Sequence, residues 1–173
     1  MNSETTLINR VAESDLQTIA LDEMIRDAVV VSFDLKDYLF QGLILKEKDF
    51  RESLKATDWT VYQDKIVAVH CSTDAIIPMW AYMLVAAYST PVAKAVYHGD
   101  EQAVLEQVLL DRIKQKDWEY LRGKRVVIKG CSDKELPASA YLEISSRLQP
   151  LVQSILYGEP CSTVPIFKRP RVV

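Results

Sequence analysis

The sequence has few glycines and cysteines, and both shortages narrow the class of protein. Among 173 residues there are 5 glycines and 3 cysteines, and no two cysteines form a C-x-x-C pair. An odd number of widely spaced cysteines does not fit a disulfide framework. The patterns G-x-G-x-x-G, G-x-x-x-x-G-K-[ST] and H-E-x-x-H are absent, which disfavours the standard nucleotide-binding loops and zinc proteases.

The sequence also lacks features typical of secretion, of membrane insertion and of nucleic-acid binding. Its N-terminal segment, residues 1–18, contains acids, Asn and Ser where a leader needs an apolar run. The longest apolar stretch, Ala75–Ala87, is too short to span a bilayer and contains Pro78. A net charge of −3, from 21 basic and 24 acidic residues, creates no field that attracts nucleic acid or anionic lipid. We therefore expect a cytoplasmic protein with neither a nucleic acid nor a membrane as partner.

What the sequence does contain is a pattern that occurs twice. Every residue of the second copy follows its counterpart in the first copy at the same separation, which is the separation between Lys65 and Lys124. Each copy predicts a strand, a loop with an acidic residue, a helix that begins near a proline, and a second strand closed by glycine. The matching positions are Lys65 with Lys124, Val67 with Val126, Asp74 with Asp133, Pro78 with Pro137, Ala81-Tyr82 with Ala140-Tyr141, and Gly99 with Gly158. Because all of these matches occur in the same order, we interpret the pattern as an internal duplication.

The duplication predicts an α/β fold made of two β-α-β units. A crossover helix makes the two strands of each unit parallel. The copies at 62–100 and 121–159 therefore predict a mainly parallel sheet of four strands, covered by helices, to which Val29–Phe33 adds a fifth. We expect residues 1–27 to form an N-terminal arm and residues 28–173 to form a single domain.

Each cysteine is followed by a serine and lies just beyond a predicted strand. The three pairs are Cys71-Ser72, Cys131-Ser132 and Cys161-Ser162. The carboxyl ends of parallel strands meet at one edge of a sheet, where ligands bind in open α/β folds. His98 ends a strand of the first copy, so we expect it to share this edge with the cysteines. Asp74 and Asp133 are expected beside them, and the more ordinary role for each is to anchor the loop.

Three hypotheses for this edge remain open, as does the question of whether the protein is an enzyme. Three thiolates and one imidazole match a coordination shell for zinc or for an iron–sulfur cluster, although ligands on loops so distant in sequence give no local signature. A thiol enzyme or sulfur carrier could use Cys71 or Cys131, each of which precedes a helix. His70 is not expected to act as its base, since adjacent strand residues point to opposite faces. Alternatively, the cysteines only pack, and the chain is an interaction module such as a homodimer.

Several short segments of the chain are distinctive: Phe33–Asp37, Lys46–Arg51, Val127–Asp133 and Gly158–Pro165. Together they resemble an uncharacterised bacterial family, the domain of unknown function numbered 2480, and the resemblance covers nearly the whole chain. It implies a cytoplasmic protein of unassigned activity. Its association with gene neighbourhoods for iron–sulfur cluster assembly implies iron–sulfur assembly proteins as partners. The resemblance carries over no catalytic residues.

Overall fold

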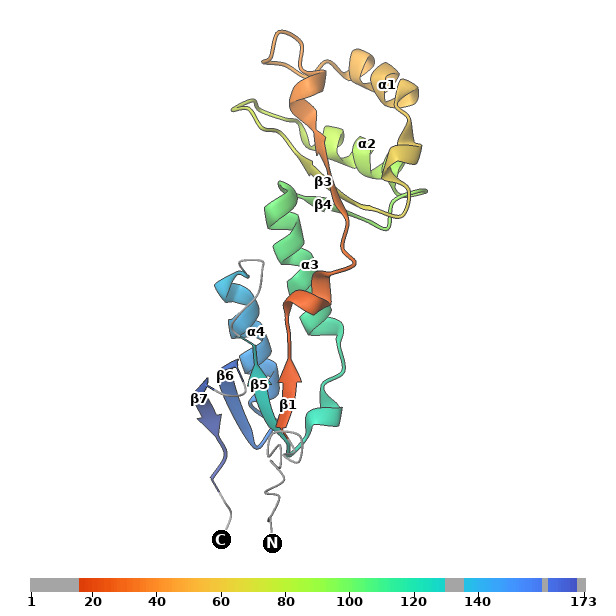
Figure 1. The fold of residues 1–173 in the computed structure, drawn as a ribbon. Helices are drawn as coiled ribbons and strands as arrows, with labels where there is room; N and C mark the ends of the chain where they lie inside the picture. Colours follow the sequence, from red (N-terminus) through yellow and green to blue (C-terminus); the bar gives the residue numbers. More distant parts are fainter. Residues whose placement is uncertain (1–15, 130–135, 160–161, 171–173) are drawn as a thin grey trace, which may run out of the picture. The chain divides into compact units, whose positions relative to one another are not determined.

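The computed structural model describes residues 16–129, 136–159 and 162–170, which belong to two compact units (Figure 1). Unit 1 takes its residues from both ends of the chain, up to Arg26 and from Leu109 onward. Unit 2 comprises the residues between them, Asp27–Val108. In the sequence, unit 2 is therefore inserted between the two segments of unit 1.

Unit 2 is built on a three-stranded parallel sheet in the order β2-β3-β4, with β3 in the centre. Its elements in chain order are β2 (Val30–Asp34), the 3-10 helix η2 (Leu35–Tyr38), α1 (Glu47–Ala56), the 3-10 helix η3 (Trp59–Tyr62), β3 (Ile66–His70), α2 (Met79–Ser89) and β4 (Ala95–His98). Helix α2 makes the crossover from β3 to β4, so the first predicted β-α-β unit is confirmed.

One face of the unit 2 sheet packs against α1 and α2 in an apolar core. The buried residues of this core are Phe33, Leu35, Leu45, Phe50, Leu54, Val67, Val69, Ile77, Ala81 and Val85. The ring of Phe33 stacks on the rings of Tyr38 and Trp59, with centroids 5.2 and 5.7 Å apart. Burying each large apolar side chain contributes about 1.5–3 kcal/mol, so this core fixes the positions of β2 and β3 relative to the helices.

Unit 1 has the same arrangement with one additional strand. Its sheet has the order β1-β5-β6-β7, in which the first three strands are parallel and β7 is antiparallel to β6. Its elements are β1 (Leu16–Ile19), the 3-10 helix η1 (Asp22–Ile25), the 3-10 helix η4 (Glu119–Leu121), β5 (Arg125–Ile128), α4 (Ala138–Leu148), β6 (Ser154–Glu159) and β7 (Ser162–Lys168). The boundary between the units falls within helix α3 (Glu101–Gln115).

The two units repeat the same elements at the shift found in the sequence. Strand β5, helix α4 and strand β6 begin at the positions that this shift assigns to the first residues of β3, α2 and β4. The correspondence extends to a side-chain hydrogen bond that precedes the central strand of each unit. Trp59 Nε1 donates to the carbonyl oxygen of Leu54 at 2.9 Å, and Trp118 Nε1 donates to that of Ile113 at 3.0 Å. Both residues of the second pair are displaced from those of the first by the same shift.

The α/β class and the mainly parallel strands covered by helices are confirmed, but the strands are distributed differently from the prediction. The two copies form one sheet each instead of sharing a single sheet. The reason is that the central strands β3 and β5 each pair, on their second side, with a strand that precedes them in the chain and not with a strand of the other copy. Strand β1, from the segment expected to be an arm, pairs with β5, and β2 pairs in the same way with β3.

The helices begin with recognisable signals. Helices α2 and α4 start directly after Pro78 and Pro137, a position where proline costs no hydrogen bond. The side chain of Asp100 accepts a hydrogen bond from the amide of Ala103 at 2.8 Å and so caps α3. In the part of the chain that the structure describes, no helix combines the length and the apolar character needed to cross a membrane.

Candidate functional site

The three parallel strands of unit 2 end in ionisable side chains. Asp34, His70 and His98 are the last residues of β2, β3 and β4, and Cys71 follows β3 directly. In open α/β sheets, ligands bind outside the carboxyl ends of the strands. We call this group of four residues the unit 2 edge and treat it as the candidate site.

The strand register divides the unit 2 edge into two faces. Asp34 pairs with His70, and His98 pairs with Val69. Paired residues of parallel strands point to the same face, and successive residues alternate. Asp34 and His70 therefore share one face with Ser32, and we call these three residues the serine face. Cys71 and His98 lie toward the opposite side with Tyr82 of α2, and we call these three residues the thiol face.

On the thiol face, Cys71 is half-buried against the apolar core, and its sulfur lies 3.3 Å from Thr73 Oγ1. The rings of Tyr82 and His98 meet edge to face, with centroids 5.2 Å apart. Burial raises the pKa of Tyr82, and the nearby thiolate charge of Cys71 raises it further. The phenol of Tyr82 is therefore neutral at physiological pH and lies close to both the thiol and the imidazole.

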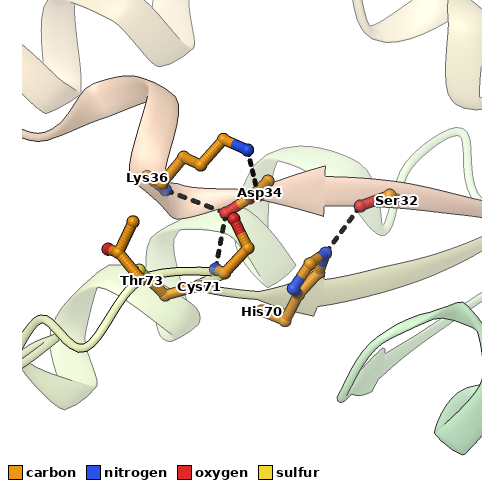
Figure 2. A network of polar contacts seen from close by, with 7 residues as sticks. Ser32, Asp34, Lys36, His70, Cys71 and Thr73 are labelled. Atoms are coloured by element: carbon orange, nitrogen blue, oxygen red, sulfur yellow. Dashed lines mark hydrogen bonds and ion pairs between the residues drawn. The ribbon is translucent and has the colours of Figure 1, made fainter.

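On the serine face, Ser32 Oγ lies 2.7 Å from His70 Nε2, and the two side chains reach toward each other across adjacent strands (Figure 2). The backbone amide of Ser32 donates to Glu101 Oε1 at 3.2 Å. Because β2 lies at one edge of the sheet, an amide on its outer side can be bound by a side chain instead of a neighbouring strand.

Asp34 ties the loop that carries Cys71 to strand β2. Its side chain is 14% exposed, and Oδ1 accepts hydrogen bonds from the amides of Lys36 and Ser72, each at 3.0 Å (Figure 2). Burial by itself raises the pKa of Asp34, but the hydrogen bonds from Ser72 and Lys36 and the charge of His70 outweigh burial and lower the pKa to about 2. The carboxylate is therefore ionised at neutral pH.

Four residues predicted for the site are described and lie at or beside the unit 2 edge, namely Cys71, His98, Ser72 and Asp74. Cys71 and His98 are brought together with Tyr82 on the thiol face. Ser72 contributes its amide to Asp34, and Asp74 is exposed in the same loop. The ring of His70, which was not expected to act as the base for Cys71, binds Ser32.

The other predicted site residues belong to unit 1, and most lie outside the described residues: Cys131, Ser132, Asp133 and Cys161. Ser162 is described and is the exposed first residue of β7. Within the three described ranges, no three His, Cys, Asp or Glu side chains form a group that could hold a metal ion. The shared coordination shell stays a prediction from the sequence.

Sequence reasoning did not single out Ser32, Asp34 or Glu101. A partial signal was present, because Ser32 and Asp34 stand two positions apart in a strand that is otherwise apolar, and such residues point to one face. Their partners, however, come from the neighbouring strand and from the start of α3. Only the pairing of β2 with β3 identifies His70 as the partner of Ser32.

Comparison with known proteins gives a match to a protein family. The model of a family described as "Protein of unknown function (DUF2480)" matches residues 5–169, in agreement with the resemblance noted in the sequence. No curated protein and no solved structure matches the chain significantly.

Proposed function

We propose that this chain, which belongs to the DUF2480 family of proteins of unknown function, is a sulfur carrier or thiol enzyme that works through the thiol face of the unit 2 edge. The observation that carries the proposal is the position of Cys71. Its half-buried thiol follows the central strand of a parallel sheet, with a hydroxyl 3.3 Å from the sulfur. A thiol so placed is fixed by the core and accessible from the edge where ligands bind.

The side chains around Cys71 suit the handling of sulfur. The hydroxyl of Thr73 can donate to the sulfur and stabilise a thiolate, which is the nucleophilic form. The thiolate attacks one sulfur of a small disulfide, forms a mixed disulfide and releases the other sulfur as a thiolate. Tyr82 and His98 border the thiol and offer polar groups to such a substrate. We place this activity in the cytoplasm, where free thiols stay reduced, with iron–sulfur assembly proteins as partners.

The test is to alkylate the reduced, full-length protein with iodoacetamide and to measure the rate at each cysteine by peptide mass spectrometry. We expect Cys71 to react fastest, and Thr73→Val to slow its alkylation, because this substitution removes the hydroxyl and keeps the shape. The matched controls are Cys131→Ser and Cys161→Ser, which should leave the rate at Cys71 unchanged. Three thiols with equally slow rates in the wild-type protein would contradict the proposal.

A second candidate function is the binding of a soft metal ion or an iron–sulfur cluster by Cys71, Cys131 and Cys161, with His98 as a further ligand. The observation in its favour is that Cys131 comes soon after β5, the counterpart of β3, so that each unit carries a thiol beyond its central strand. Cys71 and His98 fit as two donors. Zinc takes four, so this function also needs the cysteines of unit 1. A bound zinc ion or cluster would supply structural cross-linking or electron transfer.

Metal analysis separates the two candidates. Protein purified without oxygen should contain stoichiometric iron or zinc if the second candidate is correct, and Cys131→Ser should remove the metal. A bound ion would also protect Cys71 from iodoacetamide until a chelator is added. Metal-free protein of undiminished stability, with a rapidly alkylated Cys71, would support the thiol function alone.

A further inference from the structure

We propose that the serine face of the unit 2 edge is a second, independent site, at which Ser32 is a nucleophile toward an ester or thioester carbonyl and His70 is its general base. The proposal rests on the geometry of Ser32, His70, Asp34 and Glu101. It does not require the function proposed for Cys71, because the serine face and the thiol face lie on opposite sides of the sheet.

The nucleophile and the base lie at hydrogen-bonding distance. Ser32 Oγ and His70 Nε2 are 2.7 Å apart, within the range of about 2.6–3.2 Å over which a base can take the proton of a nucleophile. The two side chains come from neighbouring strands that pair in register, so the pair is held by the sheet and not by a loop. Both residues are half-buried, which fixes them while leaving one side open.

A carboxylate lies beside His70. Asp34 pairs with His70 in the strand register, and its ionised carboxylate is fixed by the amides of Lys36 and Ser72. The carboxylate of Asp34 attracts the protonated form of His70. When His70 takes a proton, this carboxylate stabilises the imidazolium, which is the electrostatic role of the acidic residue in a serine–histidine–aspartate arrangement.

Glu101 binds the backbone amide of the nucleophilic residue. Its Oε1 accepts a hydrogen bond from the amide of Ser32 at 3.2 Å. In acyl transfer by serine, the amide of the nucleophilic residue is one of the donors that stabilise the oxyanion. A negatively charged oxygen of Glu101 therefore occupies a place suited to the oxyanion of a substrate. Glu101 is an exposed side chain at the start of α3, so it can leave when a substrate carbonyl arrives.

The reaction balances without any cofactor. Ser32 Oγ attacks the carbonyl carbon while its proton moves to Nε2 of His70, which must carry its own proton on Nδ1. The carbonyl oxygen becomes the oxyanion at the amide of Ser32. Collapse of this intermediate breaks the bond to the alcohol or thiol, which leaves with the proton from His70. Water, deprotonated by His70, then cleaves the acyl-serine to release a carboxylic acid and restore Ser32.

The test uses the full-length protein, a fluorophosphonate probe and peptide mass spectrometry, with p-nitrophenyl acetate as the substrate for turnover. We expect the probe to label Ser32 and Ser32→Ala to abolish this labelling. In a Cys71→Ser background, which removes the reactive thiol, Ser32→Ala should also abolish turnover. Removing a general base slows such steps by about 10²–10⁴-fold, so His70→Gln should lower both rates by at least about 100-fold. Glu101→Gln should raise the labelling rate, because the negative charge no longer occupies the amide of Ser32.

Two controls keep the result specific. Thr18→Ala changes the position in unit 1 that corresponds to Ser32, where Lys129 stands in place of His70, and should have no effect. Cys71→Ser should leave the labelling of Ser32 intact, which separates this site from the thiol function. The proposal is overturned if wild-type protein and Glu101→Gln are both folded by circular dichroism and Ser32 is labelled in neither. The outcome does not depend on whether Ser32→Ala folds.

Discussion

The two units share one backbone arrangement but not the same polar residues. Val30 pairs with Ile66, and Leu16 pairs with Arg125. Arg125 is the counterpart of Ile66 in the repeat, so the residues of β1 correspond to those of β2. The counterparts, with unit 2 first, are Ser32 and Thr18, Asp34 and Ala20, His70 and Lys129, and His98 and Tyr157. At these four pairs of positions, the carboxylate of Asp34 and the imidazoles of His70 and His98 therefore have no equivalent in unit 1. At these positions the backbone arrangement is therefore repeated, whereas the carboxylate and the imidazoles are not.

The pairs of aromatic rings near the carboxyl ends of the strands also differ between the two units. Tyr82 meets His98 at an interplanar angle of 75°, and Tyr141 meets Tyr157 in the same way at 84°. In unit 1 this contact borders a mainly apolar cavity of about 250 Å³, lined by Ile128, Tyr141, Ser145, Tyr157 and Ile166. This mainly apolar cavity therefore lies beside the phenol of Tyr157, at the position that His98 holds in unit 2.

The largest loss of stability should come from substitutions in the cores that hold strands β1 and β2 in place. Phe33 of β2 and its counterpart Ile19 of β1 are both buried. Phe33→Ala should lower the free energy of unfolding by about 3–5 kcal/mol and Ile19→Ala by about 2–5 kcal/mol, since each leaves a cavity. Urea denaturation measures both values. A loss below about 1 kcal/mol for Ile19→Ala would mean that β1 is not an integral strand of unit 1.

A smaller and nearly equal pair of effects should come from the two tryptophan hydrogen bonds. Trp59→Phe and Trp118→Phe each leave a carbonyl oxygen without its donor, that of Leu54 or that of Ile113. Each substitution should cost about 1–3 kcal/mol by chemical denaturation, from the lost hydrogen bond and the smaller ring. Costs that differ by more than about 2 kcal/mol would break the correspondence between the units at this position.

The next effect is confined to unit 2 and depends on pH. Because the pKa of Asp34 is lowered to about 2, its carboxylate stabilises the folded protein above its unfolded pKa of about 3.9, and the stabilisation is lost as pH falls through 2. Asp34→Asn should therefore be less stable than wild type at pH 7, and the difference should shrink between pH 4 and pH 2. Thermal unfolding across this range measures it. An equal deficit at pH 7 and pH 2 would contradict the assignment.

The smallest effects should come from two matched positions on the outer faces of α2 and α4. Met83 and Leu142 occupy equivalent places in the two copies, and each is 71% exposed. Met83→Gln and Leu142→Gln should each change the free energy of unfolding by less than about 0.5 kcal/mol, because neither side chain is buried. Analytical ultracentrifugation of both variants adds a second readout. A change of oligomeric state in one of them would show that its helix face is covered by a second copy.

Much of the fold could be predicted from the sequence, because the signals that define it are local. Proline before α2 and before α4, the β-branched strands and the constant shift between the copies each follow from short segments. The two-sheet arrangement could not be predicted, since β1 is very short and pairs with a strand far along the chain, Leu16 with Arg125. Residues this far apart in sequence are brought together only by tertiary packing.

In the candidate site, too, the residues with local signals could be predicted and the contacts between distant segments could not. Cys71 and His98 were predicted because each follows or ends a recognisable strand. Ser32 and its contact with His70 were missed because the contact depends on the neighbour of β3, and Glu101 depends on where α3 begins. Asp34 anchors the loop that carries Cys71 by binding the amide of Ser72, a contact between distant segments of the chain that no local pattern indicates.

The most direct test of a duplicated scaffold with chemistry in one unit is to label a single sample of full-length protein with iodoacetamide and a fluorophosphonate, and to locate both adducts by peptide mass spectrometry. We predict early adducts at Cys71 and Ser32, both in unit 2, with Thr18 unmodified and Cys131 and Cys161 slower. Adducts that appear first or equally fast in unit 1, in protein that circular dichroism shows to be folded, would contradict the account.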